Sequence, residues 1–81
     1  MLQYALTKNA FMQILIFKTN LTHSNHIDAI GSHLDVHPAI SKWNVDREDC
    51  DNILRIVGNN IAGKEIETML VSAGYYCEEL E

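Results

Sequence analysis

The sequence predicts one α+β domain in which two helices cover one face of a four-stranded antiparallel sheet. Apolar residues recur at helical spacing in two segments, and four other short segments are rich in apolar and β-branched residues. These segments follow one another in the order βαββαβ. Two helices that each carry one apolar stripe can cover one face of such a sheet and close a core.

The first strand is expected from residue 10 to residue 21, where Ile, Leu and Phe are frequent and polar residues stand on both sides. Apolar residues fall on both of its faces, with Leu15 and Phe17 on one and Met12, Ile14 and Ile16 on the other. A strand with one face in water would alternate more cleanly, so we expect this strand to be central in the sheet.

The first helix is expected from Ser24 to Asp35, where Ile27, Ile30 and Leu34 recur at helical spacing. Pro38 imposes an extended conformation on His37 and so ends the helix.

A hairpin is expected next. "ISKWNV" (40–45) forms its first strand, with Trp43 and Val45 on one face, and "ILRIV" (53–57) forms its second strand. The polar residues between them, which include Cys50, form a solvated turn.

The second helix carries its apolar stripe on Ile66, Met69, Leu70 and Ala73. Asn59 or Asn60 is expected to cap its start, and Gly74 to end it. "YYCEEL" (75–80) then forms a short last strand. The whole is a ferredoxin-like sandwich within a single domain of residues 1–81, with an N-terminal extension at 1–9 and a core at 10–81.

Composition and charge exclude several functions. The chain has 81 residues, 47% of them hydrophobic, and a formal net charge of −5. A negative chain is a poor binder of nucleic acid and of anionic membrane surfaces. Its longest apolar run, "FMQILIF", is too short to span a bilayer, and its first residues lack the pattern of a signal peptide. We therefore expect a cytoplasmic protein with no membrane insertion, in which Cys50 and Cys77 are thiols.

The layout resembles the heavy-metal-associated (HMA) domains of small copper chaperones and metal-transporting ATPases. The residues that carry the resemblance are "ILIFKTNL", "AISKWNVD", "NILRIVGNN" and "EIETMLVSAGY". The resemblance covers the chain from about Met12 to Leu80. It implies a domain that binds or transfers metal ions and is not an enzyme.

The family's metal motif, M-x-C-x-x-C, is replaced in this chain. Its position in the first loop reads Leu21-Thr22-His23-Ser24-Asn25-His26, with both cysteines exchanged for histidines. Thiolates select Cu(I), whereas neutral imidazoles suit Zn²⁺, Ni²⁺, Co²⁺ or Cu²⁺. The sequence thus makes His23 and His26 the candidate metal ligands, for a divalent ion that binds weakly. The alternative is that this loop is a solvated turn and binds no metal.

The expected topology brings the first loop, the hairpin turn and the Gly74–Tyr75 turn to one end of the sheet. His23, His26, Cys50 and Tyr75 are therefore candidates for one neighbourhood, with Cys50 or a second molecule as the source of a third ligand. His33 and His37 are four residues apart, but Pro38 removes His37 from helical geometry, so a structural role is expected for this pair.

The sequence shows no catalytic constellation and no phosphate-binding glycine loop. A second function therefore stands beside metal binding, namely a metal-free interaction module. Its apolar surface is expected on the sheet face away from the helices, where it would bind a partner protein or a second copy in a homodimer. The residues grouped there are Met12, Ile14, Ile16, Leu54 and Ile56.

Overall fold

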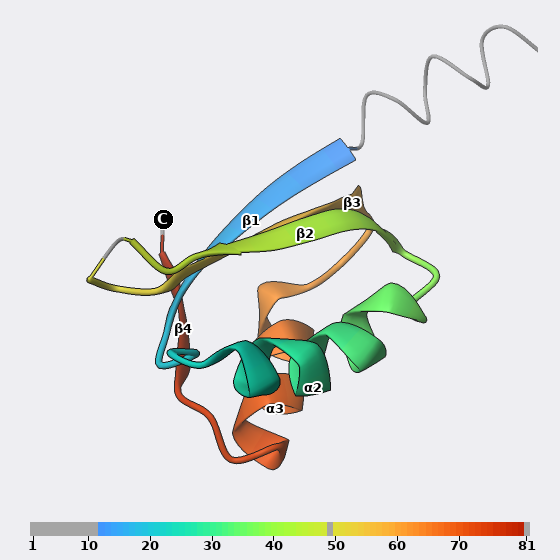
Figure 1. Cartoon of the computed structure of the whole chain (residues 1–81). Helices are drawn as coiled ribbons and strands as arrows, with labels where there is room; N and C mark the ends of the chain where they lie inside the picture. The colour runs from blue at the N-terminus through green and yellow to red at the C-terminus, as the bar shows by residue number, and fades with distance from the viewer. Residues whose placement is uncertain (1–11, 49, 81) are drawn as a thin grey trace, which may run out of the picture.

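The computed structural model describes residues 12–48 and 50–80. Its elements follow the expected order, and Figure 1 shows both helices on the same side of the sheet. The bounds are β1 Met12–Thr19, α2 Ser24–Asp35, β2 Ile40–Asp46, β3 Ile53–Asn59, α3 Gly63–Ser72 and β4 Cys77–Leu80. The predicted extension at 1–9 lies outside the described residues.

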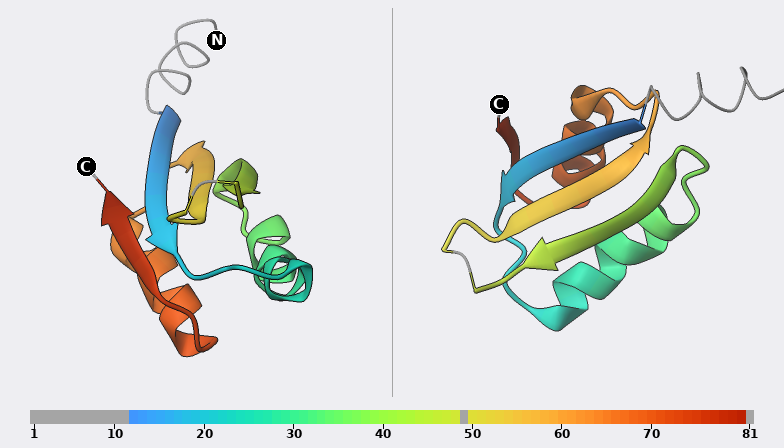
Figure 2. Two further views of the ribbon diagram at one scale, coloured as in Figure 1. Left: turned by 60° about the vertical axis from the view of Figure 1, so that its left-hand side comes forward. Right: turned by 90° about the horizontal axis from the view of Figure 1, so that it is seen from above.

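The four strands form one antiparallel sheet in the order β2-β3-β1-β4, which confirms the ferredoxin-like sandwich. β1 pairs with β3 on one side and with β4 on the other, so it is central as predicted. Figure 2 shows the sheet uncovered when it is seen from above. None of the helices in the described part of the chain is long and apolar enough to cross a membrane.

The core lies between the sheet and the helices. Strand alternation sends Phe17 of β1 and Leu54 and Ile56 of β3 toward the helices, and all three are fully buried. α2 contributes Ile30 and Leu34, and α3 contributes Ile66 and Leu70, all of them core residues. The helical spacing of the sequence identified these positions correctly.

One predicted grouping is wrong. Leu54 and Ile56 were expected on the outer face with Met12, Ile14 and Ile16, but they face the core. Leu54 pairs with Phe17, and Ile56 pairs with Leu15, so they share the inner face with these residues. A shift of one residue exchanges the faces of a strand. The outward-facing residues of β3 therefore include Arg55 and Val57.

Several element ends also differ from the prediction, and β4 begins at Cys77 and not at Tyr75. β1 ends at Thr19, because the chain turns there and places Leu21 in the core. α3 starts at Gly63 after Ala62 at the N-cap, so neither Asn59 nor Asn60 caps it. Asn59 ends β3, and Asn60 takes a left-handed conformation with φ 60° that turns the chain.

Candidate metal-binding loop

The loop between β1 and α2 is held in place by Thr19, which is buried. Its hydroxyl donates a hydrogen bond of 2.6 Å to the carbonyl oxygen of Asn52 and accepts one of 3.2 Å from the Leu21 N–H. Its own N–H donates to the carbonyl oxygen of Asp51 at 3.1 Å. These bonds fix the loop to the end of the β2–β3 hairpin, while the fully buried Leu21 fixes it to the core.

His23 and His26 lie side by side at the start of α2. His23 is the N-cap residue, and His26 is in the first turn. Their ring centroids are 4.9 Å apart, and the ring planes meet at 79°. Residues three apart on a helix share a face, so the sequence spacing explains this contact.

His26 also contacts the turn before β4. Its ring centroid lies 5.1 Å from that of Tyr75, and the neighbouring Tyr76 N–H donates a hydrogen bond of 2.9 Å to the Asn20 side chain. His26 Nδ1 is buried and has no hydrogen-bond partner among the described residues. Two of the predicted neighbours of His23, namely His26 and Tyr75, are thus part of one cluster.

The start of α2 lacks the features that usually stabilise a helix N-terminus. The His23 side chain makes no capping hydrogen bond, and the first turn carries no acidic residue. Ser, Thr, Asn and Asp are the usual N-cap residues, so helix capping does not explain a histidine at this position.

Cys50 does not join the histidines as a third ligand. It is exposed in the β2–β3 turn, with its Sγ 3.9 Å from Asp51 Oδ1. Within residues 12–48 and 50–80, no group of three or more His, Cys, Asp or Glu side chains is arranged to hold a metal ion. The expectation that the turn brings Cys50 to the histidines is therefore wrong, because the turn directs its thiol to solvent.

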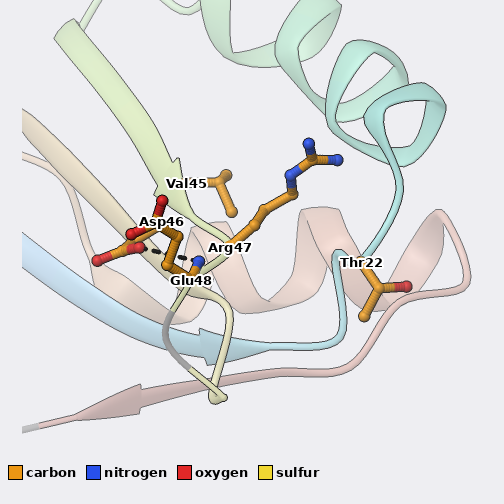
Figure 3. A pocket seen from close by; sticks show the side chains of 5 residues that line it. All are labelled: Thr22, Val45, Asp46, Arg47 and Glu48. Atoms are coloured by element: carbon orange, nitrogen blue, oxygen red, sulfur yellow. Dashed lines mark hydrogen bonds between the residues drawn. The ribbon is translucent and has the colours of Figure 1, made fainter.

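An open polar depression lies beside the loop. It has a volume of about 660 Å³. Thr22 of the β1–α2 loop lines one side of it, and residues 45–48 at the end of β2 and in the following turn line the other. In Figure 3 the Arg47 guanidinium extends away from the carboxylates of Asp46 and Glu48. The Glu48 N–H donates to Asp46 Oδ1 at 3.1 Å, which shapes the turn. No sequence pattern predicts this depression, because its residues come from two distant segments.

His37 has a structural role, as predicted, but with an unpredicted partner. The Ala39 N–H donates to its Nδ1 at 3.1 Å, and its Nε2 lies 2.6 Å from Glu65 Oε2. The first bond requires a lone pair on Nδ1, so the proton is on Nε2 and is donated to Glu65. This arrangement joins the α2–β2 loop to the first turn of α3. His33 is exposed in the last turn of α2.

The sequence matches no protein-family model and no curated protein. Solved structures that share its fold include the following two. Oxidised MerP from Ralstonia metallidurans CH34 has a TM-score of 0.72 at 14% identity, over 86% of this chain and 99% of that one. The apo HMA domain of the copper chaperone for superoxide dismutase has a TM-score of 0.73 at 17% identity, over 86% of this chain and 68% of that one. The chain therefore has the fold of an HMA domain.

Proposed function

We propose that this domain binds a divalent transition-metal ion through His23 and His26 and passes it to another ligand set. The observation that carries the proposal is the contact of the two imidazole rings, with centroids 4.9 Å apart, at the start of α2. This is the position at which the HMA family, which this chain resembles, carries its two metal-binding cysteines. The fold shared with an HMA domain of a copper chaperone supports the same class of function.

Two further features favour a ligand role for the histidines. His26 Nδ1 is buried without a hydrogen-bond partner, and a bound ion would give it one. His23 occupies an N-cap without capping the helix, so helix stability does not account for a histidine there. Imidazole ligands suit Zn²⁺, Ni²⁺, Co²⁺ and Cu²⁺ better than Cu(I).

Two imidazoles supply half of a tetrahedral ligand set, and the described residues offer no third His, Cys, Asp or Glu beside them. Binding is therefore weak and exchangeable, and the ion keeps open positions for the ligands of a partner. That property suits transfer of an ion and not its storage. The metal is cargo in this proposal, and the domain performs no catalytic step.

Titration of the metal-free protein tests the proposal. Zn²⁺, Ni²⁺, Co²⁺ or Cu²⁺ is expected to perturb the ring resonances of His23 and His26 at concentrations below about 1 mM, which corresponds to about −4 kcal/mol. Cu(I) is expected to have a smaller effect. The proposal is contradicted if none of the divalent ions perturbs these two rings.

The matched variants are His23→Ser and His33→Ser. His23→Ser is expected to abolish the response to metal but to raise the free energy of unfolding by about 0.5–1 kcal/mol, because serine can cap α2. Loss of binding would then not be a result of misfolding. His33→Ser changes an exposed histidine on the same helix and is expected to leave metal binding intact. Equal loss of binding in both variants would contradict the assignment of the site.

The metal-free interaction module is the second candidate function. It is favoured by the absence of a third His, Cys, Asp or Glu at the histidines among the described residues and by the exposed apolar side chains on the sheet. It requires no response to any of the ions above, so the same titration separates the two candidates.

A further inference from the structure

The sheet face opposite the helices combines exposed apolar side chains with basic ones. We call it the open face; Figure 2 shows it uncovered by the helices. Met12, Ile14 and Leu80 are 47%, 68% and 39% exposed. By strand alternation the open face consists of Met12, Ile14, Ile16, Lys18, Lys42, Asn44, Asp46, Ile53, Arg55, Val57, Asn59, Glu78 and Leu80.

The apolar residues form one continuous ridge along β1. Ile14 is paired with Val57 on β3, and Ile16 is paired with Leu80 on β4. Paired residues on one face have Cβ atoms about 5 Å apart, so these side chains are neighbours. Contiguous exposed apolar area of this kind marks an interaction surface.

Cations border this ridge. Lys42 is paired with Val57, and Arg55 is paired with Ile16, so each stands next to an apolar residue of the ridge. Both are exposed, and neither has an ion pair among the described residues. Lys18, at the end of the ridge, forms an ion pair with Asp51, with 3.7 Å between Lys18 Nζ and Asp51 Oδ1. The open face thus carries three of the chain's six Lys and Arg residues against two acidic residues, Asp46 and Glu78, so it has an excess of cations although the chain has a net charge of −5.

We propose that the open face binds an acidic amphipathic helix of a partner protein. The ridge would receive the apolar stripe of that helix, and Lys42 and Arg55 would pair with carboxylates along its flank. From Met12 to Ile16 the ridge is about 13 Å long, which matches about nine residues of an α-helix. This inference does not depend on His23 or His26 and goes beyond the proposed metal binding.

Charge and side-chain chemistry distinguish this occupant from three others. A second copy presents the same excess of cations, with only Asp46 and Glu78 to offset them, so it complements Lys42 and Arg55 less well than an acidic helix does. Residues 1–11 contain Lys8 and no acidic residue, so they do not complement these cations. Single-stranded nucleic acid needs aromatic residues for stacking, but the strand aromatics Phe17 and Trp43 both face the helices.

The test uses the full chain and a synthetic helical peptide of about 14 residues with leucines at i, i+3, i+4, i+7 and i+11 and glutamates on both flanks. In NMR titrations the methyl groups of Ile14, Ile16 and Val57 are expected to shift. The combined variant Lys42→Glu, Arg55→Glu is expected to weaken binding at least about tenfold, and added salt is expected to weaken it as well.

Two controls keep the result specific. Lys64→Glu reverses an exposed charge on α3, away from the open face, and is expected to leave peptide binding unchanged. Ile14→Ser is expected to weaken binding without a change in charge, because it interrupts the ridge at its most exposed residue.

Several outcomes would overturn the proposal. Equal binding of the same peptide with lysine in place of glutamate would show that charge does not select the partner. Methyl shifts that depend on protein concentration alone would identify a second copy as the occupant. Binding of an oligonucleotide and not of the peptide would identify nucleic acid, and an absence of peptide binding up to about 1 mM would leave no role for the face.

Discussion

The two cysteines differ in burial and therefore in the reactivity of their thiols. Cys77 is 8% exposed, and burial, followed by the charges of Glu67 and Glu79, raises the pKa of its thiol from the usual 9.0 to about 12. Cys50 is exposed. Because the thiolate is the reactive form, only Cys50 is expected to react with a thiol reagent in the folded protein.

The pKa of Cys77 predicts how stability depends on pH. In the unfolded chain the thiol loses its proton near pH 9, but in the folded chain it keeps the proton to about pH 12. The folded state therefore binds more protons between these values, so the free energy of unfolding falls as the pH rises from about 9 to about 12. Denaturant unfolding at pH 8 and pH 10 measures this fall. It is expected to be smaller in Cys77→Ala, and an equal fall in both proteins would contradict the assignment.

At the scale of elements, α2 packs on β2 through Gly31. A Cβ atom at Gly31 would lie 2.6 Å and 2.9 Å from two ring atoms of Trp43, which is too close for real contacts. The Trp43 ring is held by a hydrogen bond of 2.8 Å from its Nε1–H to Asp35 Oδ1. The glycine therefore permits the close approach of helix and sheet.

Gly31→Ala is expected to lower the free energy of unfolding by about 1–2 kcal/mol. Alanine improves helix propensity by about 1 kcal/mol, but overpacking against the indole costs more. In the Trp43→Leu background the same substitution is expected to be neutral or stabilising, because the ring is gone. Denaturant unfolding of the four proteins in this double-mutant cycle measures the coupling, and additive effects would contradict it.

At the scale of the whole molecule, the histidines lie at one end of the sheet, where a second molecule can reach them. Since each chain supplies two imidazoles, a tetrahedral ion is expected to bind two chains at high protein concentration. Sedimentation with half an equivalent of Zn²⁺ is expected to show a dimer that a chelator reverses. His23→Ser is expected to stay monomeric, and a zinc-dependent dimer of this variant would place the contact elsewhere.

The order of the elements and the buried helix residues of the core follow from the sequence pattern alone. The helical spacing of Ile30 and Leu34 and of Ile66 and Leu70 identified the buried helix faces, because a helix must bury its apolar stripe. The i and i+3 spacing of His23 and His26 likewise predicted their contact, because these positions are neighbours on one helix.

The features that no local pattern predicts depend on contacts between distant segments. The outer face of β3 follows from its register with β1, which places Arg55, and not Leu54, on the open face; no local pattern specifies that register. The partnership of His37 with Glu65 and the separation of Cys50 from the histidines likewise depend on how loops and turns lie against remote elements. The spacing of residues along the chain determines which side chains share one face of a helix or strand. Which other elements contact that face depends on tertiary packing, because the contacting residues are distant in the sequence.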